Sequence, residues 1–274
     1  MFSKIIYVFL FIVLFCASLS AKEFTFAVMT DSHLIVNKGG SYSPFPSTIR
    51  IVNDITKNKP AFVIHCGDMI HANIWEHSDP NVMKMWDCFD NTVAKPLEKA
   101  EIPLFITKGN HDVVYGNTAS IYRQKWESKE PEKIKLTSGK FNNYYTFEYE
   151  NCLFIVLDGH ALSLPDDECD WLAKHIAYGK TKNAVFVITH IGLSGGLRHP
   201  NEYLHGRAAE LLKNAPYKLW ILSGHHHIYS MKNYGNAVNV ISGCAGTSAL
   251  VYIEPIYLNV TVDGKNVKIE PIKK

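Results

Sequence analysis

Short apolar runs alternate with amphipathic segments along most of the chain. Continuous apolar runs with the length of buried α/β strands occur at 24–29, 61–66, 104–107, 185–188 and 219–222. Apolar residues at helical spacing predict helices at 47–58, 81–99, 118–127, 165–177 and 203–213. Pro96 should kink or shorten the second of these helices. The order of the first elements, β-α-β-α-β, favours a parallel sheet with right-handed crossovers.

The later part of the chain is richer in strands. The apolar runs 144–149 and 153–157 flank a short polar turn, which indicates a hairpin. Further strands are predicted at 237–241, 250–262 and 266–272, with Asp263-Gly264 as a hairpin turn between the last two. Because neither a repeat nor a low-complexity linker divides the sequence, we predict one α/β domain over residues 22–274.

Five of the predicted strands end in polar residues of the same chemical kind. In 104–112 an apolar strand runs into Gly109 and then presents Asn110, His111 and Asp112. The other strands end in Asp31-x-His33, Gly67-Asp68, Thr189-His190 and Gly224-His225-x-His227. Ligands bind at the carboxyl ends of strands in open α/β sheets, and alternate residues of an extended chain share a face. A lone histidine is more often structural, but together these strand ends predict one site.

Imidazole, carboxylate and amide donors without a thiolate suit manganese, iron, zinc or nickel, and the sequence does not select among these metals. The chain has 274 residues, of which 47% are hydrophobic, as in ordinary globular proteins. Its net charge of +2 comes from scattered lysines and arginines, which argues against binding to a nucleic-acid polymer.

The ordered motifs resemble the calcineurin-like metallophosphoesterase superfamily. The family pattern of Asp-x-His, Gly-Asp, Gly-Asn-His-Asp/Glu, His and Gly-His-x-His is matched without a gap from Asp31 to His227. The style of the motifs is most similar to the small phosphodiesterase members. The resemblance implies a four-layer α/β/β/α sandwich, in which helices flank two central mixed β-sheets and the strand-rich tail fits the second sheet.

The resemblance also implies roles for individual residues. One metal ion would be held by Asp31, His33, Asp68 and His227, and the other by Asp68, Asn110, His190 and His225, with Asp68 bridging the two. His111 would face the substrate and assist charge development or protonate the leaving oxygen. Asp112 would orient His111 by accepting its other ring proton.

The implied function is hydrolysis of a phosphodiester or, less favoured, a phosphomonoester by attack of a metal-bridging hydroxide. The implied cofactors are two divalent or mixed-valence transition metal ions. A non-catalytic metal-binding or scaffold protein on the same fold is the alternative. A purple acid phosphatase is not indicated, because His71 occupies the position of that group's tyrosine ligand, three residues after Asp68.

Residues 1–21 have the layout of a secretory signal peptide. Lys4 precedes a continuous apolar run at 5–15, and small residues follow at 17–21. Cleavage would give a secreted or periplasmic protein without a membrane span, whereas an uncleaved segment would anchor it. The remaining five cysteines are an odd number, so one disulfide or two could form but the pairing is not determined. The sequence does not determine the oligomeric state.

Other polar residues are weaker candidates. His71 lies just past Gly67-Asp68, but a surface histidine is the favoured interpretation. His65 is predicted to be a core histidine, and His226 is predicted to point away from its two neighbours. Arg207 is a candidate phosphate contact. The substrate should be set by the loops 34–46, 72–80, 113–140 and 192–202.

Overall fold

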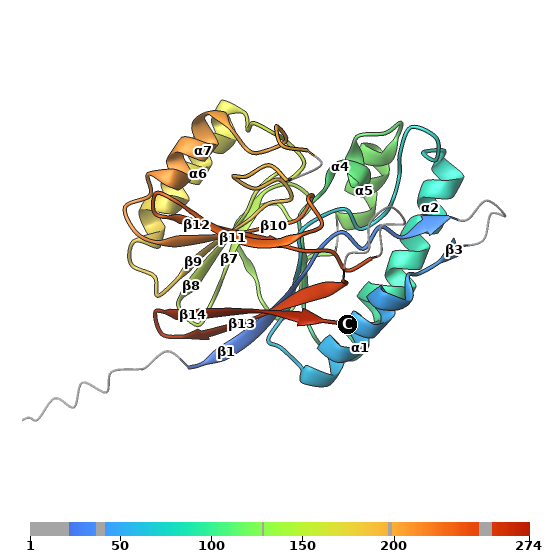
Figure 1. Cartoon of the computed structure of the whole chain (residues 1–274), viewed down its shortest axis with the longest axis horizontal. Helices are drawn as coiled ribbons and strands as arrows, with labels where there is room; N and C mark the ends of the chain where they lie inside the picture. The colour runs from blue at the N-terminus through green and yellow to red at the C-terminus, as the bar shows by residue number, and fades with distance from the viewer. Residues whose placement is uncertain (1–21, 37–41, 128, 197–198, 247–253) are drawn as a thin grey trace, which may run out of the picture.

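Two β-sheets lie against each other at the centre of the molecule, and helices cover their outer faces (Figure 1). The computed structural model describes residues 22–36, 42–127, 129–196, 199–246 and 254–274. Each sheet contains both parallel and antiparallel pairs. The predicted fold class, with two mixed sheets flanked by helices, is therefore confirmed.

The first sheet has five strands in the order β14-β13-β1-β4-β5. Strands β1 (Phe24–Met29), β4 (Val63–His65) and β5 (Leu104–Ile106) are parallel, as the β-α-β-α-β order predicts. The tail strands β13 (Ile256–Asp263) and β14 (Asn266–Lys273) extend this sheet, because β13 pairs antiparallel with β1. The expectation that the whole tail fits the second sheet is wrong, since Val260 and Val262 fill the apolar core beside β1.

The second sheet has the order β11-β12-β10-β9-β8-β7-β6. Its strands are β6 (Leu136–Gly139), β7 (Tyr145–Tyr149), β8 (Cys152–Val156), β9 (Val185–Ile188), β10 (Leu219–Ser223), β11 (Tyr229–Tyr234) and β12 (Ala237–Ser242). The four strands β8, β9, β10 and β12 are mutually parallel, and the outer strands are antiparallel. Edge strands β6 and β11 were not predicted, because their partly exposed residues lack an apolar run.

The predicted helices all form, with one interruption. The helices are α1 (Pro46–Asn58), α2 (Asp79–Phe89), α3 (Lys95–Lys99), α4 (Asn110–Val113), α5 (Thr118–Trp126), α6 (Asp166–Gly179) and α7 (Gly206–Lys213), and a small hairpin is formed by β2 (Ile35–Val36) and β3 (Tyr42–Ser43). The helix predicted at 81–99 contains a π-helical turn, Asp90–Ala94, between α2 and α3. Because Pro96 has no N–H to donate, the helical ladder shifts just before it, and the Lys95 N–H reaches the carbonyl of Asp90.

An aromatic core joins the two sheets. Phe105 of the first sheet stacks on Phe147 of the second with ring centroids 3.7 Å apart, and Phe26 meets Phe154 edge to face at 5.4 Å. A second apolar cluster packs α6 and α7 onto the outer face of the seven-stranded sheet. The large interlocked rings fix the two sheets relative to each other, so the carboxyl ends of β1, β4, β5, β9 and β10 meet at one edge.

Some expectations fall on parts of the chain that are not described. The predicted signal peptide, residues 1–21, lies outside the described residues, as does the first part of the strand predicted at 250–262. No helix in the described part of the chain is long and apolar enough to cross a membrane. The five cysteines within the described ranges are buried and free, so the disulfide that the sequence left open does not form among them.

Candidate active site

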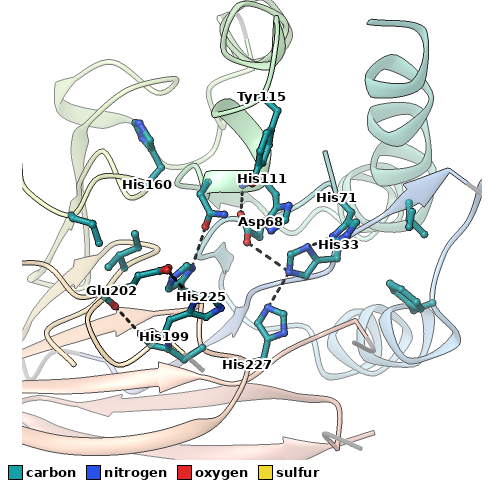
Figure 2. A pocket seen from close by; sticks show the side chains of 16 residues that line it. His33, Asp68, His71, His111, Tyr115, His160, His199, Glu202, His225 and His227 are labelled. Carbon is teal, nitrogen blue, oxygen red and sulfur yellow. Dashed lines mark hydrogen bonds and ion pairs between the residues drawn. The ribbon is translucent and has the colours of Figure 1, made fainter. Parts of the chain in front are cut away.

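The five strand ends bring all seven predicted metal ligands together. His33, Asp68, His225 and His227 are seen lining one cleft in Figure 2. Asp31 and His33 follow β1, Asp68 follows β4, and Asn110 begins α4 just after β5. The second sheet contributes His190 after β9, and His225 and His227 after β10. Most of these side chains line a cavity of about 640 Å³. The predicted convergence is therefore observed, although the ligand roles stay predictions.

The first group consists of Asp31, His33 and His227, whose ligand atoms lie within 4.8 Å of one another. Nε2 of His227 is 3.1 Å from Oδ1 of Asp31 and 3.0 Å from Nε2 of His33. The other carboxylate oxygen of Asp31 accepts hydrogen bonds from the hydroxyl of Thr30 and the backbone N–H of His225. Oδ2 of Asp31 thus links the two sheets, and Oδ1 faces the histidines of the first group.

The second group consists of Asp68, His190 and His225, with Asn110 beside them. Nδ1 of His190 donates to the Cys66 carbonyl at 2.7 Å, which leaves its Nε2 facing Oδ2 of Asp68 at 3.2 Å. Nδ1 of His225 lies 3.1 Å from Oδ1 of Asn110. Four donors from both sheets therefore face a common point.

Asp68 lies between the two groups, as Figure 2 shows. Its Oδ1 accepts the backbone N–H of His111 at 2.8 Å. Its Oδ2 is 3.2 Å from Nε2 of His190 in the second group and 3.7 Å from Nε2 of His33 in the first. This is the position expected of a bridging carboxylate.

The backbone at the site is strained. Of the nine non-glycine residues with positive φ in the described chain, five are predicted ligands: Asp31, His33, Asp68, His225 and His227. Each such conformation costs about 1–3 kcal/mol and typically persists at functional sites. The expectation that Asp-x-His and His-x-His share a face as extended strands is wrong, because these residues lie in left-handed turns beyond the strand ends. The turns, rather than strand alternation, aim the side chains.

Gly109 permits the close approach of β4 and β5 at the site. A Cβ atom at this position would lie 2.1 Å from Oδ1 and 2.3 Å from the backbone nitrogen of Asp68. Any side chain would therefore displace the central carboxylate. This turn requires glycine, as predicted, but the reason is this clash and not the backbone conformation, since the φ of Gly109 is −99°.

The donors fit divalent transition metals. Two buried atoms, Oδ1 of Asp31 and Nε2 of His190, form no hydrogen bond with a described residue, although buried polar atoms normally have a partner. Nε2 of His33 and His227 are only 3.0 Å apart, so one proton or a neighbouring cation must separate their lone pairs. Metal ions beside these atoms would satisfy all of them, and the mixture of imidazole, carboxylate and amide donors suits such ions.

The electrostatics of the cleft favour cations. Burial alone would raise the pKa of Asp68, but the attraction of nearby histidines, His190 first, holds this pKa below its ordinary value. The pKa of Asp31 is likewise held below its ordinary value despite burial, chiefly by His227. Burial lowers the pKa of His190, yet Asp68 raises it to about 9 overall. Burial and His190 lower the pKa of His225 to about 4. Both carboxylates are therefore ionised at neutral pH, and a cation that binds beside His190 would displace its proton.

His111 lines the cavity but is held differently from the sequence-based expectation. Its Nδ1 donates to the carbonyl of Ala72 at 2.6 Å. Asp112 instead accepts backbone N–H groups from Met69, Ile70 and Gly109, at 2.9, 3.1 and 2.8 Å. The expected contact between Asp112 and the His111 ring is therefore wrong, because consecutive side chains of the short helix α4 do not face each other. Asp112 fastens the Asp68 loop to the Gly109 turn.

We expect Asp112→Ala to destabilise the fold. Three buried N–H groups would lose their acceptor at about 1–3 kcal/mol each, so the free energy of unfolding should fall by roughly 3 kcal/mol or more. The thermal midpoint should drop by about 6–12 °C. The control is Asp87→Ala, since Asp87 is exposed on α2, and it should leave the midpoint within about 2 °C. An Asp112→Ala protein as stable as the control would contradict this role.

The site contains two residues, His71 and Glu202, that the sequence does not assign to it. The predicted surface position of His71 is wrong, because its Nδ1 lies 3.0 Å from Nδ1 of His33 and its ring stacks on His111 with centroids 4.8 Å apart. Burial and the neighbouring His33 lower the pKa of His71 to about 3. Glu202, in the loop before α7, places Oε2 2.6 Å from Nε2 of His225. A histidine three residues after a predicted ligand was an available signal for His71, whereas a lone loop glutamate carries none.

The contacts of the other weak candidates show whether each belongs to the site. His65 is buried against Ser32, as predicted for a core histidine. Nε2 of His226 bonds to the carbonyl of Glu202, away from both metal groups. Arg207 pairs with Asp166 and Asp170 on α6, outside the cleft, so its suggested phosphate contact is wrong. A surface carboxylate pair is the nearer partner for its guanidinium.

The pattern of the calcineurin-like phosphoesterase family matches residues 24–229. This match covers the whole cleft and most of both sheets, so the chain belongs to that family.

Individual relatives are more distant. Over 208 residues the chain is 26% identical to the Homo sapiens protein named serine/threonine-protein phosphatase CPPED1, with 69% of this chain and 60% of the relative aligned. The chain thus matches 60% of the length of this relative and of its Mus musculus counterpart, to which it is 25% identical.

Solved structures show the same fold. A dimetal phosphatase from Danio rerio superposes with a TM-score of 0.63 at 12% identity, covering 91% of this chain and 96% of the other. GAP50, described as the anchor in the inner membrane complex of Plasmodium, superposes with a TM-score of 0.62 at 13% identity, covering 92% and 84%.

Proposed function

We propose that this protein hydrolyses phosphate esters at the cleft with two metal ions. One ion would be held by Asp31, His33, Asp68 and His227, and the other by Asp68, Asn110, His190 and His225. The observation that carries the proposal is the position of Asp68 Oδ2, within 3.7 Å of both groups of donors. When bound, a pair of such ions lowers the pKa of water and stabilises negative charge on phosphoryl oxygens.

The chain keeps the site attractive to anions. Among the seven proposed ligands only Asp31 and Asp68 carry negative charge, while the Asn110 amide is neutral and the four imidazoles would be neutral once they bind metal. Two carboxylates offset only half of the charge of two divalent ions. A phosphate ester would therefore enter a site of net positive charge, and the more negative transition state would be stabilised further.

His111 would hold a proton for the leaving oxygen. Because the Ala72 carbonyl can only accept, the ring proton of neutral His111 lies on Nδ1 and Nε2 carries a lone pair. Burial lowers the pKa of His111 in the free protein, and a bound phosphate anion would raise it again. The imidazolium can then donate from Nε2 to the oxygen whose bond to phosphorus breaks.

A phosphodiester fits the cleft better than a phosphomonoester. Apolar side chains line it from both halves of the fold: Ile35 lies in β2 and Phe45 just before α1, whereas Leu162 and Ile191 follow β8 and β9. A diester has two organic substituents that these walls could contact, and a monoester has one. A phosphorylated peptide is the second candidate, because the curated relatives are named as serine/threonine-protein phosphatases.

Hydrolysis assays test the proposal. The purified protein is reloaded separately with manganese, iron, zinc or nickel and supplied with bis-p-nitrophenyl phosphate, p-nitrophenyl phosphate and a phosphoserine peptide. We expect metal-dependent turnover, with kcat/KM for the diester at least about tenfold above the monoesters, a difference of about 1.4 kcal/mol. Higher kcat/KM for the phosphopeptide would replace the diester by a peptide substrate. Metal binding without turnover of any substrate would favour the scaffold alternative.

A further inference from the structure

A carboxylate outside the predicted motifs reaches the second group of donors. Glu202 lies in the loop between β9 and α7, and its Oε2 is 2.6 Å from Nε2 of His225 (Figure 2). Only the opposite ring nitrogen, Nδ1, faces Asn110. Glu202 therefore contacts His225 on the side away from the proposed metal ion.

This contact selects the form of the imidazole. An ionised carboxylate can only accept, so Nε2 of His225 carries the proton and Nδ1 keeps its lone pair toward Asn110. His190 is held in the same way, since its Nδ1 donates to the Cys66 carbonyl. Histidines that bind metals commonly donate their second N–H to such an acceptor, which fixes the ring and makes it a better ligand.

Glu202 is itself held in place by other contacts. Its Oε1 is 2.9 Å from Nδ1 of His199, and its backbone carbonyl is 3.1 Å from Nε2 of His226. The end of the loop is fixed by the Leu204 N–H, which donates to the Gly192 carbonyl at 2.7 Å. The side chain is partly exposed at 42%, yet both of its oxygens have histidine partners.

We propose that Glu202 is a positioning residue that orients His225 and thereby determines how tightly the second group holds its metal ion. The inference rests on the proposed function, because it concerns an ion that the function requires. It also connects the loop that borders the substrate cleft to the metal site. Alternatively, Glu202 could bind the ion directly, and the two roles differ in what a glutamine at this position would do.

Cobalt binding to the full chain tests the proposal without an activity assay. Metal-free wild type, Glu202→Ala, Glu202→Gln and the control Glu210→Ala are dialysed against a series of free Co²⁺ concentrations, and bound cobalt is measured per chain. Glu210 is a matched control because it is 65% exposed on α7 and, among the described residues, its side chain pairs with Lys213 and Asn214 at the surface. Circular dichroism confirms that each variant is folded.

We expect Glu202→Ala to lower the affinity for one of the two cobalt ions by about 10–100-fold. The affinity for the other ion should stay within about twofold of that of wild type. Glu202→Gln should lose less, since its amide oxygen still accepts the Nε2 proton, and Glu210→Ala should match wild type. Unchanged binding in Glu202→Ala, or equal losses for alanine and glutamine, would overturn the positioning role. Wild type that binds no cobalt would overturn the proposed function itself, which separates the two failures.

Discussion

Asp68→Asn should remove almost all activity while the protein stays folded. The neutral side chain would lose the charge that lies within 3.7 Å of both donor groups, so at least one ion should no longer bind. Metal-dependent stabilisation of the transition state amounts to several kcal/mol, and each 1.36 kcal/mol is a factor of ten, so kcat should fall by about 10³-fold or more. This is the largest effect that we expect from a single substitution.

Asparagine is preferred to alanine here for two structural reasons. Its amide oxygen can still accept the N–H of His111, and asparagine tolerates the positive φ of 53° at this position. The measurements are kcat and bound metal per chain, with the exposed surface carboxylate Asp170 changed to Asn as the control. Two ions bound with wild-type affinity in Asp68→Asn would contradict a bridging role for Asp68.

His111→Ala should separate chemistry from metal binding. Loss of a positioned proton donor costs about 10²–10⁴-fold in rate, so kcat should fall by that amount while two ions remain bound. The ring is held by the Ala72 carbonyl and lines the cavity, but it belongs to neither of the two proposed ion sites. The control is His175→Ala on α6, away from the cleft, which should keep the wild-type rate.

Two other outcomes would be informative for His111. A wild-type kcat in His111→Ala would mean that His111 takes no part in the mechanism. A lost ion would instead assign His111 to metal binding, because ligand atoms of His33, His71 and His111 also lie within 4.8 Å of one another. We expect neither outcome, since both ring nitrogens of His33 are already engaged, Nε2 with His227 in the first group and Nδ1 with His71.

Several contacts around Asp68 and His111 could not be predicted from the sequence. Asp112 follows His111 directly, and adjacency suggested that it orients that ring. Instead it accepts three backbone N–H groups, two of them from residues more than forty positions earlier. His71 and Glu202 likewise act through contacts with residues 38 and 23 positions away. Such contacts have no periodicity or spacing in the chain, so a single sequence does not reveal them.

The sequence by itself determined the buried strands, the longer helices and the chemistry of the site. Buried strands are continuous apolar runs because both faces exclude water, and amphipathic helices repeat every 3.6 residues, so β1, β4, β5, β9 and β10 could be located directly. The polar residues that follow these strands are the candidate metal ligands, and the order of their motifs along the chain indicated the family.

Only the tertiary structure decided how those donors are aimed and held. The pairing of β13 with β1, the left-handed turns at Asp31 and His225, and the contacts of Asp112 and Glu202 all depend on how the two sheets pack. Packing of the aromatic core between the sheets sets these distances, and the energy of a hydrogen bond or a clash depends on distance in space rather than on separation along the chain.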